Sequence, residues 1–169
     1  MDMAVEKAAS SWAVGASLEK PQMTSLEDAL YRLRLAQEHL EDAEFEFQYA
    51  RWSKAALSAQ LSVENSAKSV IALFSPTVKA HDLAGELLDQ VKNSMPLEKK
   101  ESLRAMAGFA EKLGLKEHIL TSYGDEVALK TPREIYDQDK ARKALGIARQ
   151  AVELARAFIE NIEDLPKRT

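Results

Sequence analysis

Apolar residues recur at helical spacing along most of the chain, and the clearest run spans residues 49–74. This segment holds no Gly or Pro, and its apolar positions are three or four residues apart, which is the period of an amphipathic α-helix. The stripe consists of Trp52, Ala56, Ala59, Val63, Ala67, Val70 and Phe74. Small residues in its middle allow neighbouring helices to approach closely. We therefore expect this helix to be the buried axis of a bundle.

The same period predicts the rest of the fold. Further helices are expected over residues 24–48, 80–92, 96–113 and 137–163, with another turn or two over residues 118–123. Pro76, Pro96 and Gly114 mark breaks, because a proline disfavours helical backbone in the residue before it and a glycine suits a helix end. No segment has the pattern of a strand of useful length. The sequence predicts an all-α fold, an up-and-down antiparallel bundle of four to five helices.

The pattern also divides the chain into parts. Residues 1–23 are rich in Ala and Ser and are expected to form a weakly ordered N-terminal extension or a short helix. Residues 24–163 form the bundle, and residues 164–169 form a tail. Within the bundle, residues 124–136 are the longest stretch without helical periodicity, and long loops of compact domains are often functional.

Composition and charge narrow the function classes. The chain has no Cys, which excludes disulfides, thiolate metal sites and Cys nucleophiles. A formal net charge of −4 argues against a protein that coats nucleic acid generally. No apolar run approaches the roughly 20 residues of a membrane span, and the acidic start MDMAVEKAAS is unlike a signal peptide. A cytoplasmic location without membrane contact is expected.

General catalytic and cofactor motifs are absent from the sequence. There is no GxxxxGK[ST], no strand-linked GxGxxG and no HExxH. A di-iron site in a bundle needs Glu three residues before His, and none of the three His has one there. No metal site and no cofactor are therefore expected.

Three segments together resemble a known family. They are YARWSKAALSAQLSVENSAKSVIALF, KAHDLAGEL and HILTSYGDEVALKTPREIYDQDKARKALGIARQAVELARAFI. Their combination resembles the HEPN domain (higher eukaryote and prokaryote nucleotide-binding), in particular its stand-alone archaeal and thermophilic-prokaryote members. The resemblance covers about residues 26–160.

The resemblance implies a helical bundle that forms a homodimer. It also implies one of two roles. Many such domains are ribonucleases with Arg-x(4–6)-His at the start of a late helix, where Arg holds the phosphate and His assists proton transfer. Others are partners of a minimal nucleotidyltransferase in a toxin–antitoxin-like pair, with nucleotide or RNA as a further ligand.

The sequence departs from the ribonuclease pattern. The last helix and the loop before it carry Arg133, Arg142, Arg149 and Arg156 but no His. The literal matches, Arg34 to His39 and the longer Arg32 to His39, lie in the first helix, outside the family position. Ser122 stands before Tyr-Gly-Asp, where relatives often carry Arg. These departures favour a non-catalytic or weakly catalytic partner subunit over a ribonuclease.

The candidate ligand or partner groove consists of Glu64, Lys68, His81, Asp82, Tyr123 and Asp125. Glu64 and Lys68 are spaced for an i, i+4 ion pair. Either this pair fixes helix register or Lys68 reaches a nucleotide phosphate. His81 and Asp82 either begin the third helix or join a polar cluster with Lys68 and Tyr123.

Tyr123 and Asp125 likewise allow two interpretations. Either they pin the long loop to the body, or they belong to the groove. Two alternatives to the partner-subunit role also stay open: a HEPN ribonuclease with a non-standard active site, and a dimeric helical interaction module without a ligand.

Overall fold

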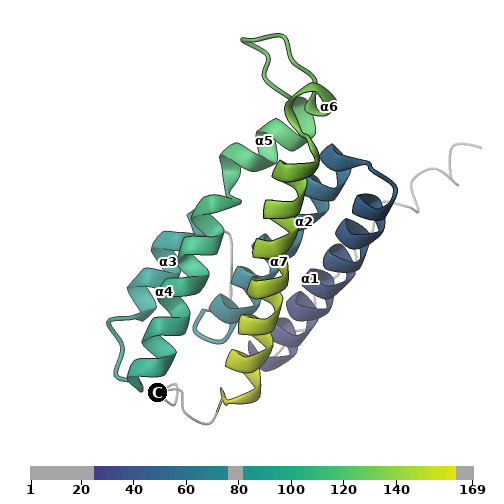
Figure 1. The fold of residues 1–169 in the computed structure, drawn as a ribbon. Coiled ribbons are helices and arrows are strands. Elements are labelled where there is room, and N and C mark those ends of the chain that lie inside the picture. The colour runs from purple at the N-terminus through teal and green to yellow at the C-terminus, as the bar shows by residue number, and fades with distance from the viewer. Residues whose placement is uncertain (1–24, 76–81, 163–169) are drawn as a thin grey trace, which may run out of the picture.

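A computed structural model describes residues 25–75 and 82–162 of the chain. The expected N-terminal extension (1–23), the tail (164–169) and His81 lie outside these residues. The helices are α1 (Ser25–Gln48), α2 (Trp52–Ala72), α3 (Leu83–Gln90), α4 (Leu97–Lys112), α5 (Leu115–Tyr123), α6 (Pro132–Ile135) and α7 (Gln138–Glu160). The described part has no β-strand, only an isolated bridge between Asp125 and Lys130. The predicted all-α fold is confirmed (Figure 1).

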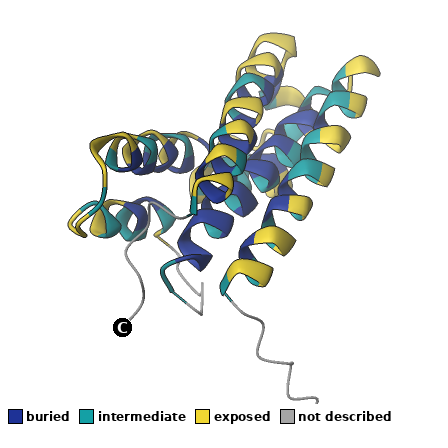
Figure 2. Ribbon diagram, turned by 90° about the horizontal axis from the view of Figure 1, so that it is seen from below, coloured by how far each residue is buried: buried dark blue, intermediate teal, exposed yellow. Residues whose placement is uncertain are grey.

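The helix α2 is the axis of the bundle, as its small-residue stripe predicted. It contacts every other helix of the described part. Ala56, Ala59, Val63, Ala67 and Val70 of the stripe are inaccessible to solvent. Figure 2 shows buried residues lining the inner faces of the helices, with exposed residues on their outer faces.

Aromatic pairs hold the two ends of this stripe. The Trp52 ring meets Phe47 of α1 edge-on, with 5.0 Å between ring centroids, and Phe74 meets Phe158 of α7 at 6.1 Å. Both stripe residues are partly buried against the core. They connect α2 to its long neighbours α1 and α7.

The buried surface of α2 extends beyond its apolar stripe, because serines beside the stripe are buried as well. Ser62 donates to the Ala36 carbonyl oxygen of α1 at 2.7 Å, Ser66 to Ser62 at 2.8 Å and Ser69 to Ser66 at 2.7 Å. Each hydroxyl thereby has a partner, so its burial carries little penalty. The small side chains allow α1 to lie close to α2.

The start of α2 differs from the predicted helix over residues 49–74. Residues 49–51 form the turn between α1 and α2, with Ala50 in the left-handed region at φ 55°. The Arg51 amide donates to the Glu46 carbonyl oxygen at 2.9 Å, and the Ala50 amide donates to that of Phe47 at 3.1 Å. These two bonds form a Schellman motif, which usually uses glycine. Because Ala occupies the turn, no Gly or Pro marks it in the sequence.

The segment after α4 contains more helix than predicted. Gly114 ends the α4 turn and also serves as the N-cap of α5, so α5 has nine residues. Gly124 then turns the chain at φ 81°, where a Cβ would clash with the Lys130 carbonyl oxygen. The short α6 follows within the predicted loop, with a capping box formed by Thr131 and Glu134.

The remaining helices form a second group. The helices α3 and α4 pack on each other, and α4 also contacts α7. Buried Lys99 of α4 donates to the Phe158 carbonyl oxygen of α7 at 3.0 Å. Within residues 25–75 and 82–162, no helix is both long enough and apolar enough to cross a membrane.

Candidate functional site

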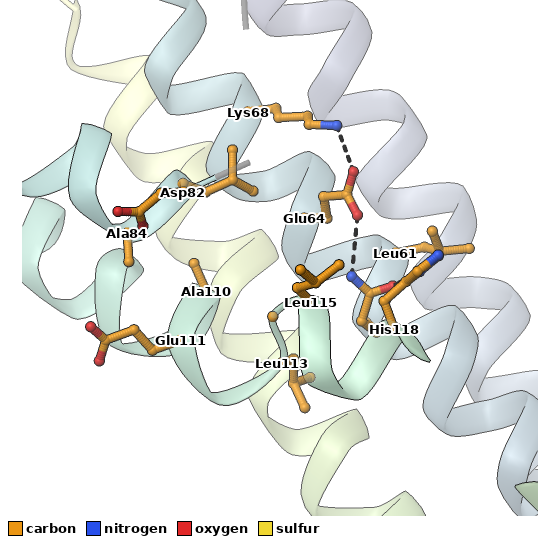
Figure 3. A pocket seen from close by; sticks show the side chains of 13 residues that line it. Leu61, Glu64, Lys68, Asp82, Ala84, Ala110, Glu111, Leu113, Leu115 and His118 are labelled. Carbon is orange, nitrogen blue, oxygen red and sulfur yellow. Dashed lines mark hydrogen bonds and ion pairs between the residues drawn. The ribbon is translucent and has the colours of Figure 1, made fainter. Parts of the chain in front are cut away.

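A pocket lies where α2 meets the α3–α4 pair and α5 (Figure 3). We call it the α2–α5 pocket. Its volume is about 560 Å³, within the usual range for small-molecule sites. It is lined by Gln60, Leu61, Glu64, Lys68, Asp82, Leu83, Ala84, Ala110, Glu111, Leu113, Gly114, Leu115 and His118.

A chain of four polar side chains crosses the pocket wall. Lys68 Nζ donates to Glu64 Oε1 at 2.5 Å, and Gln60 Nε2 donates to Glu64 Oε2 at 3.1 Å. His118 Nδ1 lies 3.1 Å from Gln60 Oε1. The predicted i, i+4 pair of Glu64 and Lys68 is therefore present.

The direction of these hydrogen bonds determines which ring nitrogen of His118 carries the hydrogen. Because the Gln60 amide nitrogen donates to Glu64, its oxygen accepts from His118. Nδ1 of His118 is then protonated, and in the neutral ring Nε2 is the acceptor. The chain thus gives His118 a defined orientation and tautomer.

Glu64 is the charged centre of the chain. Burial by itself raises the pKa of its carboxyl group, because a charge is less stable away from water. Hydrogen bonds from Lys68 and Gln60, with the positive charges of Lys68 and His118, outweigh burial and lower the Glu64 pKa from its ordinary value. Glu64 is thus ionised at neutral pH, and it holds the ammonium group of Lys68.

The α3 side of the pocket adds further acidic groups. Asp82 is the N-cap of α3 and accepts from the Gly85 amide at 2.9 Å. Glu111 of α4 lies on the same side (Figure 3). Three carboxylates thus line the pocket with one ammonium group. Since Lys68 is already paired with Glu64, this charge balance opposes the binding of phosphate at Lys68.

Tyr123 and Asp125 lie apart from these residues. They line a separate hollow of about 330 Å³ where α5 meets the loop. Asp125 accepts from the Ala128 amide at 2.9 Å, and Tyr123 is 69% exposed. The hydroxyl that ties this region to the body belongs to Tyr136, which donates to Glu117 at 2.8 Å. Of the predicted groove residues, the structure brings together Glu64, Lys68 and Asp82.

Sequence reasoning missed His118 as a member of the pocket. His118 and Gln60 are 58 positions apart in the chain, so helical spacing cannot relate them. The row Gln60, Glu64 and Lys68 marked one wall, but the facing wall depends on how α5 packs on α2. Within residues 25–75 and 82–162, no cluster of three or more His, Cys, Asp or Glu could hold a metal ion.

The literal ribonuclease match does not form a site on α1. Arg34 and His39 are five residues apart, so their side chains point about 140° apart around the helix. Arg32 donates to Asn65 of α2 at 3.4 Å and lies 3.9 Å from Asp28. None of these residues lines the α2–α5 pocket.

The chain is similar to a known structure in its fold and to a known family in its sequence. The chain is similar to the protein TT1696 from Thermus thermophilus, known from its crystal structure, with a TM-score of 0.58 and 19% sequence identity. The similarity covers 77% of this chain and 97% of that one. No curated protein matches the sequence. Residues 29–162 match the family described as HEPN domain. Since this match includes most of the chain, the protein belongs to the HEPN domain family.

Proposed function

We propose that this HEPN protein is a non-catalytic or weakly catalytic partner subunit of a minimal nucleotidyltransferase, in a toxin–antitoxin-like pair. The observation that carries the proposal is the acidic character of the α2–α5 pocket. Its polar wall is held by hydrogen bonds, and apolar residues complete the lining. Such a pocket suits a cationic side chain of a partner protein, because a buried Arg or Lys requires a nearby carboxylate.

The ribonuclease alternative has less support from the described residues. A ribonuclease of this kind needs a cation to hold the phosphate beside a proton-transferring group. In the pocket, the ammonium group of Lys68 is occupied by Glu64, 2.5 Å away. On α1, Arg34 and His39 do not share a face. Arg32 does lie on the face of His39, but its guanidinium group contacts Asn65 and Asp28. A partner role agrees better with both arrangements.

The first test is co-expression with a minimal nucleotidyltransferase from the same organism. We expect the two proteins to elute as one complex in size-exclusion chromatography. Replacing Glu64 and Glu111 by Gln should weaken the complex at least about tenfold, since each loses a charged contact. Glu98→Gln with Glu101→Gln, on exposed positions of α4, is the matched control. Absence of a complex, or equal weakening by the control, contradicts the proposal.

The second test separates the subunit from an enzyme. The purified protein is incubated with single-stranded and structured RNA, and we expect no specific cleavage. Cleavage that His118→Ala or His81→Ala abolishes, while His39→Ala leaves it intact, would establish the ribonuclease alternative instead.

A further inference from the structure

The outward face of α5 carries a row of large apolar side chains. Leu115, Ile119 and Tyr123 follow one another at intervals of four residues, so they lie along one side of the helix. Their exposed fractions are 65%, 45% and 69%. Single exposed apolar side chains are common, but three in one row of a nine-residue helix indicate a contact surface. We call this row the α5 stripe.

The side of α5 that faces the bundle is largely polar. His118 hydrogen-bonds to α2, and Glu117 accepts from Tyr136 at 2.8 Å. The buried residue of α5 is Thr121, whose hydroxyl donates to the Glu117 carbonyl oxygen at 2.8 Å. Leu120 packs against the hydrophobic core. A surface helix usually turns its apolar stripe towards the core. Packing within this chain therefore does not explain the α5 stripe.

Acidic groups lie at both ends of the stripe. At its first end, Leu115 lines the α2–α5 pocket together with the three carboxylates of that pocket (Figure 3). At its other end, Ile119 and Tyr123 line the hollow of about 330 Å³ together with Asp125 and Glu126. An occupant of this surface is therefore expected to be apolar in its middle and positively charged at its ends.

The lysines near the stripe do not reverse this charge balance. Lys68 in the pocket is paired with Glu64 at 2.5 Å. Lys116 borders the stripe, three residues before Ile119, and is exposed. Its charge is screened by water and salt. The pocket and the hollow together are lined by more carboxylates than cations, so the surface favours a basic partner.

We propose that the α5 stripe binds an amphipathic α-helix of a partner protein, with a basic residue at each end of that helix's apolar row. Apolar side chains four residues apart on the partner pack against Ile119 and its neighbours. Leu115 and Tyr123 are eight positions apart, about 12 Å, so the two basic residues are at least about two turns apart. The inference rests on the proposed function in one respect, namely that the α2–α5 pocket receives a cation of a partner protein.

The test uses a synthetic helix as the probe. A fluorescein-labelled, Ala-rich peptide of about 15 residues carries two Leu four residues apart and an Arg at each end of this row. Fluorescence anisotropy during titration with the full chain should show saturable binding, with a dissociation constant below about 100 μM. A peptide with Glu in place of Arg, and one with the same residues in shuffled order, should bind at least about tenfold more weakly. Absence of binding by the basic peptide, or equal binding by the acidic one, overturns the proposal.

Variants locate the binding on α5. Ile119→Asp should raise the dissociation constant of the basic peptide at least about tenfold, because a charge replaces an apolar contact. Leu115→Ser, a milder change, should raise it about threefold to tenfold and decides the matter if Ile119→Asp fails to fold. Leu88→Asp on α3 is the matched control, since Leu88 is 43% exposed, and should bind as the parent does. An equal effect of Leu88→Asp contradicts the proposal.

Two further measurements separate this inference from the proposed function. A complex with the nucleotidyltransferase that Ile119→Asp leaves equally strong would overturn the inference and leave the proposed function standing. Peptide binding in the absence of any such complex would contradict the proposed function alone. If Ile119→Asp instead turns a dimer of this chain into a monomer in light scattering, the stripe contacts a second copy and the partner helix is ruled out.

Discussion

Ala50 adopts a conformation that its side chain disfavours. It is at the C′ position of the Schellman motif after α1, with φ 55°. A Cβ in the left-handed region costs about 1–2 kcal/mol, whereas glycine adopts it freely. Replacing Ala50 by Gly removes this cost. Part of the resulting stabilisation is offset, because glycine loses more conformational entropy on folding.

We therefore predict that Ala50→Gly stabilises the protein by about 0.5–1 kcal/mol. Urea unfolding followed by circular dichroism measures the change. The control is Ala105→Gly on the exposed face of α4, where the same replacement should destabilise by about 1 kcal/mol. If both variants lose stability, the turn is not strained.

Lys68 and Glu64 give a prediction with a defined pH dependence. Lys68→Met removes a hydrogen bond to a partly buried carboxylate and should cost about 1–2 kcal/mol at pH 7. Because the folded-state pKa of Glu64 is lowered, the stabilisation is present above the unfolded pKa and is lost as the pH falls through the folded pKa. The difference between parent and variant should therefore shrink below about pH 4.

Urea titrations at several pH values measure this difference. Lys143→Met, at an exposed position of α7, is the matched control and should show a small difference that does not depend on Glu64. A gap between parent and Lys68→Met that stays constant down to pH 3 would show that the ion pair is not its source.

At the scale of elements, Tyr136 connects α6 to α5. Its buried hydroxyl donates to Glu117 at 2.8 Å. Burial and the hydrogen bond to Glu117 raise the Tyr136 pKa, so the hydroxyl stays protonated in the folded protein. The contribution of this raised pKa is present below the unfolded pKa, about 10, and is lost as the pH rises further.

We predict that Tyr136→Phe destabilises the protein by about 1 kcal/mol at neutral pH. Hydrogen exchange should also become faster in the α5–α6 loop. Tyr123→Phe is the comparison, since one interpretation of the sequence had Tyr123 pin this loop and the structure leaves it exposed. A larger effect of Tyr123→Phe would restore the original expectation.

The elements show what the sequence could predict. Helical periodicity identified the long helices and the axial role of α2, because apolar spacing depends on local geometry alone. It missed the turn at Ala50, where no Gly or Pro marks the break. It also missed α6, which is a single turn stabilised by the Thr131 and Glu134 capping box.

The site was predictable only in part, for a similar reason. One face of α2 carries Gln60, Glu64 and Lys68, so their spacing alone predicted that they lie next to one another. His118 reaches its position through a contact between segments 58 positions apart in the chain. Periodicity in one sequence carries no information on that contact.

At the scale of the whole molecule, two pockets of opposite charge share α2. The acidic α2–α5 pocket lies along its middle, and a smaller pocket with Arg51, Lys54 and Arg133 in its lining lies at its start. Opposite charges separated along one rigid helix can select different partners without competing.

The most exposed apolar side chains of the described part lie on the loop after α5. Val127 is 98% exposed and Leu129 is 86% exposed. Figure 1 shows this loop projecting from the end of the bundle. Large apolar side chains that are exposed to solvent close to one another are typical of a contact surface.

We predict that the protein is a homodimer with this loop in the interface. Light scattering should give twice the chain mass of 18.8 kDa at micromolar concentration. Val127→Asp with Leu129→Asn should yield a monomer, because burial of each apolar side chain contributes about 1.5–3 kcal/mol. Asn tolerates the left-handed backbone of Leu129, at φ 54°, so the loop itself should persist.

The control for the dimer is Leu97→Asp at the start of α4, where the apolar side chain is 66% exposed. It makes a comparable replacement on another surface and should leave the mass unchanged. A parent protein that scatters as a monomer contradicts dimerisation itself. A dimer that survives the double loop variant but not Leu97→Asp would place the interface on α4, and the exposed loop would then be free to contact the proposed nucleotidyltransferase partner.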